Sequence, residues 1–185
     1  MAFLAALWMP IVLSAIIVFI ASSIMHTVLK YHQSDCRKFA NEDKVLEVLR
    51  GENLQRGLYI FPFSAPKDMK SAAMVEKYKQ GPIGMLTVLP KGQPVMAKFI
   101  GQWFVYCLVI SFFVGYLAWH TLAVGVHYLV VFRVVGTAAF LAYGLSQISN
   151  GIWKGQTWSM TIKEVVDGLI YGLLTAGTFG WLWPR

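Results

Sequence analysis

Arg133 is the residue whose type and position most strongly suggest chemistry in this 185-residue sequence. It lies about nine residues inside an apolar stretch that runs from 124 to 146. An arginine deep in a membrane-spanning helix costs about 2.5–3.5 kcal/mol, so it usually faces a bundle interior or a cavity. Hydroxyl side chains occupy similar depths in three other apolar stretches, at Ser14, Ser111 and Thr175. We therefore predict a polar intramembrane layer of these four residues that contacts an anion or substrate. The alternative is an arginine that reaches outward, bonds only hydroxyls and carbonyls, or meets a partner subunit.

Asp167 is the other charged residue inside an apolar stretch, and we identify it as a candidate acid at the inner leaflet. The helical rise of about 1.5 Å per residue puts it roughly 12 Å from Arg133 in depth, too far for an ion pair. Lys163, one turn earlier, is a nearer partner. We expect Asp167 to stabilise the first turn of its helix, where the dipole favours a carboxylate. A proton relay and a subunit contact are the alternatives.

The histidines form no pattern typical of a metal or haem site. His26 ends the first apolar stretch, whereas His120 and His127 lie near the opposite boundary. The sequence contains no HExxH, CxxC or nucleotide-binding motif. We therefore predict no catalytic residue, no metal and no cofactor, with a weak external metal site at His120 and His127 as the alternative.

These residues belong to an unusually apolar chain. Hydrophobic residues make up 57% of it and charged residues 14%, against about 25% charged in soluble domains. This composition excludes a disordered chain and argues against a soluble enzyme. Four stretches are long enough to cross a bilayer as helices, at about 4–24, 99–119, 124–146 and 165–183. We predict an all-α membrane protein, a four-transmembrane-helix bundle with a small cytoplasmic α+β insert between helices 1 and 2.

The distribution of basic residues predicts the orientation. Twelve of the sixteen Lys and Arg residues lie between 25 and 98, and two more lie between the third and fourth stretches. Basic loops stay in the cytoplasm. We therefore place the N- and C-termini outside and divide the chain into a first span (1–25), a cytoplasmic insert (26–97) and a region with three spans (98–185). The first span lacks the basic start of a cleaved signal peptide, which favours a retained anchor.

The insert has local signals for two helices and two strands. Asn41 followed by acidic residues predicts a helix start, and a second helix is expected over 71–80. Runs rich in aromatic and branched residues predict strands at 57–63 and 84–89. Four lysines accompany the second helix, and we expect either contact with anionic lipids of the cytoplasmic face or an ordinary solvated surface: Lys67, Lys70, Lys77 and Lys79. Because basic and acidic residues are interleaved, no nucleic acid partner is predicted.

Small residues recur at every fourth position of the last stretch. The row consists of Gly168, Gly172, Ala176 and Gly180. Such a row lets a neighbouring helix approach closely. The third stretch carries matching small residues at Ala138, Ala142 and Ser146, and a further pair at Gly136 and Gly144. We expect packing between the third and fourth helices, with a homo-oligomer or a larger membrane complex as the alternative.

Three segments carry a resemblance to known sequences: QWFVYC at 102–107, DGLIYGLLTAGTFGWLWP at 167–184 and KQGPIG at 79–84. They resemble a family of bacterial four-span inner-membrane proteins with no established activity. The resemblance extends over nearly the whole chain. It implies a multi-pass protein of the bacterial inner membrane, but it brings no cofactor or catalytic residue.

Together these features favour a non-enzymatic integral membrane protein of structural or accessory type, packing with itself or with a larger membrane complex. The first alternative is a small anion or solute transporter, or a channel subunit, that uses the layer around Arg133. The second is a membrane enzyme acting on lipid. An enzyme of that kind requires a polar cavity open to the inner leaflet and lined by at least two titratable groups.

Overall fold

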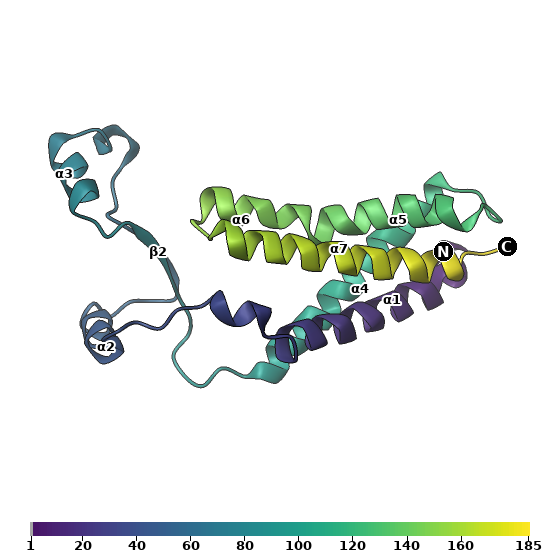
Figure 1. Cartoon of the computed structure of the whole chain (residues 1–185), viewed down its shortest axis with the longest axis horizontal. Helices are drawn as coiled ribbons and strands as arrows, with labels where there is room; N and C mark the ends of the chain where they lie inside the picture. The colour runs from purple at the N-terminus through teal and green to yellow at the C-terminus, as the bar shows by residue number, and fades with distance from the viewer. Residues whose placement is uncertain (1) are drawn as a thin grey trace. The chain divides into compact units, whose positions relative to one another are not determined.

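The computed structural model describes residues 2–185 and is mostly helical. The chain divides into two compact units. The first unit joins the N-terminal part, up to Asp35, to the segment Val95–Arg185, and the second is the intervening segment Cys36–Pro94. The elements of both units are drawn in Figure 1. The second unit is shorter at both ends than the predicted insert of 26–97, because residues up to Asp35 fold onto the helices of the first unit.

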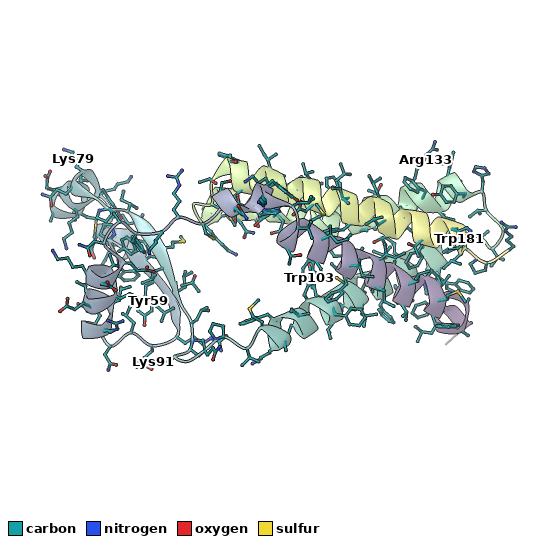
Figure 2. The ribbon with its side chains drawn as sticks, turned by 60° about the horizontal axis from the view of Figure 1, so that its bottom comes forward. Tyr59, Lys79, Lys91, Trp103, Arg133 and Trp181 are labelled. Carbon is teal, nitrogen blue, oxygen red and sulfur yellow. The ribbon has the colours of Figure 1, made fainter. Side chains whose placement is uncertain are left out.

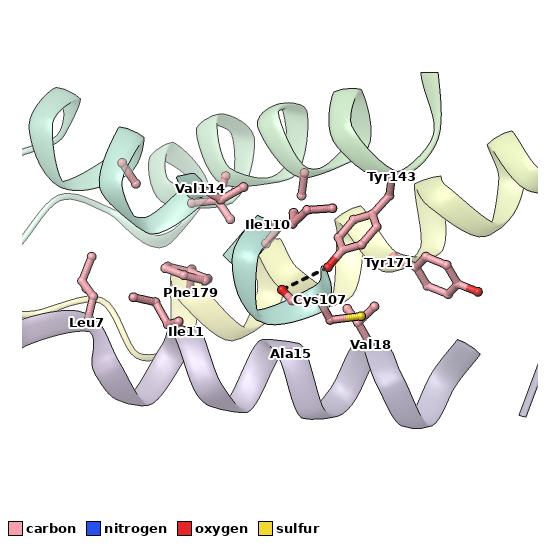
Figure 3. Close-up of a cluster of buried hydrophobic side chains, with 14 of the residues drawn as sticks. Leu7, Ile11, Ala15, Val18, Cys107, Ile110, Val114, Tyr143, Tyr171 and Phe179 are labelled. Carbon is pink, nitrogen blue, oxygen red and sulfur yellow. Dashed lines mark hydrogen bonds between the residues drawn. The ribbon is translucent and has the colours of Figure 1, made fainter. Parts of the chain in front are cut away.

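Long helices build the first unit. They are α1 (Ala2–Thr27), α4 (Met96–Thr121), α5 (Tyr128–Tyr143) and α7 (Trp158–Trp181). Shorter helices complete it: η1 (Lys30–Ser34), η3 (Leu145–Gln147) and α6 (Ile148–Trp153). Helix α5 packs along α7, while α1 packs against both α4 and α7. Buried apolar residues from all four long helices meet in one core, part of which is shown in Figure 3.

Within residues 2–185, three segments are long and apolar enough to cross a membrane. They are Ala2–Thr27, Met96–Thr121 and Tyr128–Trp153. The last of these combines α5, η3 and α6. Helix α7 is not among them, although the sequence predicts a span at 165–183. The reason is compositional, since α7 carries Lys163, Glu164 and Asp167 near the start of its apolar part.

The small-residue row of α7 faces α5. A Cβ atom at Gly168 would lie 2.2 Å from the Cα atom of Gly144, and one at Gly172 would lie 3.1 Å from the backbone nitrogen of Phe140. Gly136 meets Ala176 in the same interface. Real Cβ atoms do not approach backbone atoms at 2.2 Å, so the two helices can lie this close only because both residues lack a side chain. The row is met by Gly136 of α5 and by Gly144 directly after it, whereas Ser146 is exposed in η3.

The second unit contains two helices and a two-stranded sheet. Helices α2 (Glu42–Gly51) and α3 (Ala72–Gln80), the short η2 (Pro66–Asp68), and strands β1 (Gly57–Phe61) and β2 (Gly84–Val88) form it. The strands are antiparallel, with Gly57 opposite Val88 and Phe61 opposite Gly84. The Ser71 hydroxyl accepts a hydrogen bond from the Met74 backbone N–H and caps α3. None of the helices in this unit fully buries a side chain. This agrees with the small core expected for so short a segment.

Candidate functional site

Six polar side chains of the first unit meet where α1 ends and η1 packs against α7. We call them the His–Asp cluster: His26, Tyr31, His32, Asp35, Lys163 and Asp167. His26 occupies the last turn of α1. Extended backbone at Leu29 ends that helix, and the 3-10 turn of η1 follows directly. This turn carries Tyr31 and His32 back onto the first half of α7.

Asp167 lies at the centre of the cluster and is 3% exposed. Its Oδ2 atom lies 2.8 Å from Nε2 of His32 and 3.9 Å from Nε2 of His26. Its Oδ1 atom accepts a hydrogen bond from the Tyr31 hydroxyl. A carboxylate removed from water is costly unless donors surround it. Tyr31 and His32 are donors of that kind, and both come from the segment that follows α1.

Asp35 and Lys163 form a second layer behind His32. Asp35 Oδ2 lies 2.6 Å from His32 Nδ1, and its Oδ1 lies 2.6 Å from Lys163 Nζ. Lys163 also donates to the Tyr31 backbone carbonyl at 2.6 Å and to the Ser34 hydroxyl at 2.8 Å. The ammonium group therefore has three oxygen partners. It fixes Asp35, and Asp35 in turn fixes the His32 ring.

These contacts shift three pKa values outside the long helices. The hydrogen bond from Lys163 lowers the pKa of Asp35 against the effect of burial, and His32 adds to the lowering. Burial acts to lower the pKa of His32, but hydrogen bonds to Asp35 and Asp167 outweigh it, so that pKa is raised. Burial and the hydrogen bond to Asp167 raise the pKa of Tyr31. The cluster thus favours an ionised Asp35 beside a protonated His32 when no other cation is bound.

His26 is the accessible member of the cluster, with a side chain that is 52% exposed. Its ring stacks on that of His32, with centroids 4.4 Å apart and planes 11° from parallel. Its Nδ1 atom lies 3.0 Å from the Ser22 backbone carbonyl. Because a carbonyl only accepts, we assign the proton to Nδ1. In the neutral ring this leaves the lone pair on Nε2, which lies 3.9 Å from Asp167 Oδ2.

His26, His32 and Asp167 can hold a metal ion, because each offers a ligand atom within 4.8 Å of the other two. Sequence reasoning missed this group. The two histidines straddle a helix end, and Asp167 lies 135 residues after His32, so no short motif joins them. One feature of the sequence could have indicated the group. His26 follows the end of one predicted span and Asp167 lies at the start of another, so both are expected at the same membrane boundary.

A cleft of about 470 Å³ adjoins the cluster. It lies between α1, α4 and α7 at the end where α1 stops and α4 starts. Apolar side chains form most of its wall: Phe19, Met96, Phe99, Ile100 and Trp103. The Trp103 Nε1–H group donates to the Ser22 hydroxyl at 2.8 Å, which fixes the indole. At the polar end the cleft is lined by His26, Gln147, Glu164, Asp167 and Tyr171.

Tyr171 is the one residue within 2–185 whose buried side-chain oxygen has no hydrogen-bond partner. The residue is 3% exposed, and its ring packs edge-on to Trp103 and Tyr143. Figure 3 shows its hydroxyl directed away from the labelled core residues. A buried hydroxyl without a partner costs about 1–3 kcal/mol. At the wall of a cleft, this hydroxyl is available to a polar atom of water or of another molecule that enters the cleft.

The predicted polar layer is only partly assembled. Ser14, Ser111 and Thr175 are fully buried, and the Ser14 hydroxyl donates to that of Ser111 at 3.0 Å. The Thr175 hydroxyl instead bonds the Tyr171 carbonyl of its own helix. Arg133 is exposed on α5 and does not join these residues (Figure 2). Arg133 therefore matches the alternative stated above, in which the side chain reaches outward from the helix bundle.

Two expectations about Asp167 are wrong. Helix α7 begins at Trp158, so Asp167 lies beyond its first turn and is not placed there by the helix dipole. Lys163 is one turn away but bonds Asp35 instead. Both differences arise because α7 starts earlier than the apolar pattern suggests, and because η1 supplies closer partners.

Comparison with known proteins gives no relative from which a role could be transferred to these residues. No family model matches the chain, no curated protein matches it, and no solved structure matches it.

Proposed function

We propose that the chain is an integral membrane protein in which α7 is the fourth span. With 24 residues, α7 is about 36 Å long, against a hydrocarbon thickness of about 30 Å. Its charged residues lie in the first half, close to the ends of α1 and α4, where an interface is expected. In this arrangement the second unit lies in the cytoplasm and both termini lie outside, in keeping with the basic residues of that unit. The bacterial inner membrane is the location that the resemblance suggests.

Within this membrane protein, the cleft binds a lipid-like molecule that has an apolar body and a neutral, oxygen-bearing polar end. The observation that carries this proposal is the Tyr171 hydroxyl, which is buried, without a partner and at the wall of an apolar cleft. The apolar body would lie against Phe99 and Trp103. The polar end would reach Tyr171 and His26. The role is that of an accessory component that holds or presents a lipid, alone or within a larger complex.

The charges around the cleft favour a neutral polar end. Its acidic and histidine wall residues are Glu164, Asp167 and His26, and no lysine or arginine is among the described wall residues. Lys163, which precedes Glu164 in the sequence, already has three oxygen partners. An anionic headgroup in the cleft would meet two acidic side chains of the wall, which is unfavourable in a site of low dielectric constant. A hydroxyl, ester or quinone oxygen satisfies Tyr171 without that repulsion.

Contact quenching tests this proposal. The purified protein is placed in nanodiscs in EDTA and titrated with diacylglycerol brominated in its acyl chains, which quenches tryptophan on contact. We expect a saturable component of quenching, above the background from the six other tryptophans, that is lost in a Trp103→Phe variant because Trp103 lines the cleft. Tyr171→Phe should weaken binding about 2- to 10-fold, the value of one hydrogen bond.

Two controls make the outcome decisive. Tyr116→Phe removes an exposed hydroxyl on α4, outside the cleft, and should leave the titration unchanged. Brominated phosphatidylglycerol should quench Trp103 less than the neutral lipid does. Equal quenching by the two lipids, or identical titrations for Tyr171→Phe and the parent, would contradict the proposal.

An enzyme acting on the same lipid is the second candidate, because one histidine and two carboxylates line the cleft: His26, Glu164 and Asp167. Mass spectrometry of diacylglycerol before and after incubation with the protein tests it. Products formed by the parent and lost in His26→Ala would favour the enzyme, whereas unchanged lipid would favour a binding role. Transport of an anion at Arg133 gains no support from the position of that residue.

A further inference from the structure

We propose that His26, His32 and Asp167 bind a divalent first-row transition-metal ion through two imidazole Nε2 atoms and one carboxylate oxygen. This inference concerns a different ligand from the lipid-like molecule above and does not rest on it. It stands on the ring orientations, on the distances between the ligand atoms and on access from outside.

Both histidines already make the second hydrogen bond that metal-ligating histidines make. In metalloproteins the non-coordinating ring nitrogen usually donates to a backbone carbonyl or a carboxylate. His26 Nδ1 faces the Ser22 carbonyl at 3.0 Å, and His32 Nδ1 faces the Asp35 carboxylate at 2.6 Å. Nε2 is therefore the nitrogen left for an ion in each ring, and both Nε2 atoms lie within 3.9 Å of the same oxygen, Oδ2 of Asp167.

The carboxylate has a matching arrangement. Asp167 Oδ1 accepts from the Tyr31 hydroxyl, so Oδ2 is the oxygen left for an ion. Asp35 is held by Lys163 at 2.6 Å, which keeps the orienting carboxylate ionised and in place. These contacts form the hydrogen-bonded shell that sets ligand geometry in metal sites.

The ligand distances bracket those of a bound ion. Metal–ligand bonds of about 2.0–2.2 Å in a tetrahedron separate the ligand atoms by about 3.3–3.6 Å. Here the separations from Asp167 Oδ2 are 2.8 Å to His32 and 3.9 Å to His26. The shorter distance is that of a hydrogen bond in which a proton occupies the place of the ion. Because the two imidazole planes are 11° from parallel, exchange of that proton for a metal also requires the exposed His26 ring to rotate out of its stack on His32.

The chemistry of the ligands selects the class of ion. Two imidazoles and one carboxylate suit Zn²⁺, Fe²⁺, Co²⁺ or Ni²⁺ better than Mg²⁺ or Ca²⁺, which prefer oxygen. Three protein ligands leave one position open. Because His26 and Asp167 also line the cleft, that position faces it. The 52% exposure of the His26 side chain gives an ion a way in.

Metal loading of the full-length protein tests the inference. Protein stripped with EDTA is dialysed against Zn²⁺ without added lipid, and bound zinc is measured by elemental analysis. Co²⁺ then serves as a spectroscopic probe of a tetrahedral site. We expect about one Zn²⁺ per chain and proton release on binding, because the ion displaces the proton held by His32. His26→Ala and Asp167→Asn should each weaken binding by at least about tenfold, and Asp35→Asn by about tenfold through loss of ring orientation.

His120→Ala is the matched control. His120 is exposed, and its Nδ1 faces the Tyr116 backbone carbonyl at 2.8 Å, as His26 faces Ser22. It has no carboxylate in reach among the described residues, so its removal should leave zinc binding unchanged. If Asp167→Asn fails to fold, zinc binding by His26→Ala still tests the inference, because the His26 side chain is exposed and its removal should not prevent folding. A parent protein that does not load zinc, or His26→Ala that binds as tightly as the parent, would overturn the inference. The quenching titration in EDTA remains interpretable in either case.

Discussion

His32 and Asp167 are hydrogen-bonded at 2.8 Å across 135 residues of sequence. This contact joins the segment after α1 to the first half of α7. Each partner has a second support, since Asp35 fixes His32 and Tyr31 fixes the far oxygen of Asp167. The cluster is therefore a tertiary link of the first unit as well as a candidate ligand site.

Replacement of Asp167 by Asn should destabilise the protein. The change removes a buried negative charge between His32 and Tyr31. It also replaces one of the two acceptor oxygens that these residues donate to with an NH₂ group. Loss of one member of a buried ionic group costs about 3–5 kcal/mol. We expect a lower midpoint of thermal unfolding in detergent with EDTA, measured by circular dichroism. Glu164→Gln, on the same helix but bonded only to Gln156, should shift the midpoint much less. A midpoint for Asp167→Asn equal to that of Glu164→Gln would speak against the link.

Asp35 gives a prediction for pH in the metal-free protein. Its folded pKa is lowered by Lys163, so its stabilising contribution is present above the unfolded value of about 3.9. That contribution disappears as pH falls through the lowered folded value. The parent should therefore be more stable than Asp35→Asn at pH 6 in EDTA, and the difference should shrink below about pH 4. Unfolding midpoints across this range provide the measurement. A difference that stays constant down to pH 3 would show that Asp35 acts without its charge.

Gly168 should not tolerate a methyl group. Its Cβ would lie 2.2 Å from the Gly144 Cα atom, and backbone atoms cannot move aside as a flexible side chain can. Gly168→Ala should separate α7 from α5 at a cost of about 1–3 kcal/mol or more. Gly177→Ala is the control on the same helix, because its Cβ would meet only the Tyr128 hydroxyl at 3.7 Å. Similar unfolding midpoints for the two variants would contradict the close approach.

Substitution of Ser14 should destabilise the protein more than substitution of Arg133. Arg133→Leu changes an exposed position on α5 and should alter the free energy of unfolding by less than about 0.5 kcal/mol. Ser14→Ala removes the buried hydrogen bond to Ser111 and should cost about 1 kcal/mol. Denaturant titration of both variants in the same detergent compares them. A larger effect for Arg133→Leu than for Ser14→Ala would restore Arg133 to the polar layer.

Native cysteines allow a test of orientation. Cys36 is exposed in the second unit, and Cys107 is buried in α4. In a Cys107→Ser background, a membrane-impermeant maleimide should label Cys36 in inverted vesicles but not in intact cells. Labelling from outside intact cells would place the second unit on the opposite side from the one proposed.

The sequence predicted the long helices of the first unit and the two helices and two strands of the second, but not η1, η3 or α6. Long apolar runs with at most one charge predicted α1, α4 and α5, because apolar length decides whether a helix can cross a bilayer. The strands of the second unit followed from their aromatic and branched residues, and the small residues of α7 indicated the side that packs closely. Local composition determines these features, so a single sequence reveals them.

Only the tertiary structure decided which residues meet. Helix α5 carries apolar residues on all of its faces, so its hydropathy pattern did not reveal that Arg133 would face outward. The His–Asp cluster depends on the fold-back of η1 onto α7, which brings together residues with no shared spacing. The free hydroxyl of Tyr171 depends on the packing of Trp103 and Tyr143 around it. Local sequence determines the secondary-structure propensity and the length of each element. A site made from separate segments of the chain depends instead on how those elements pack in three dimensions.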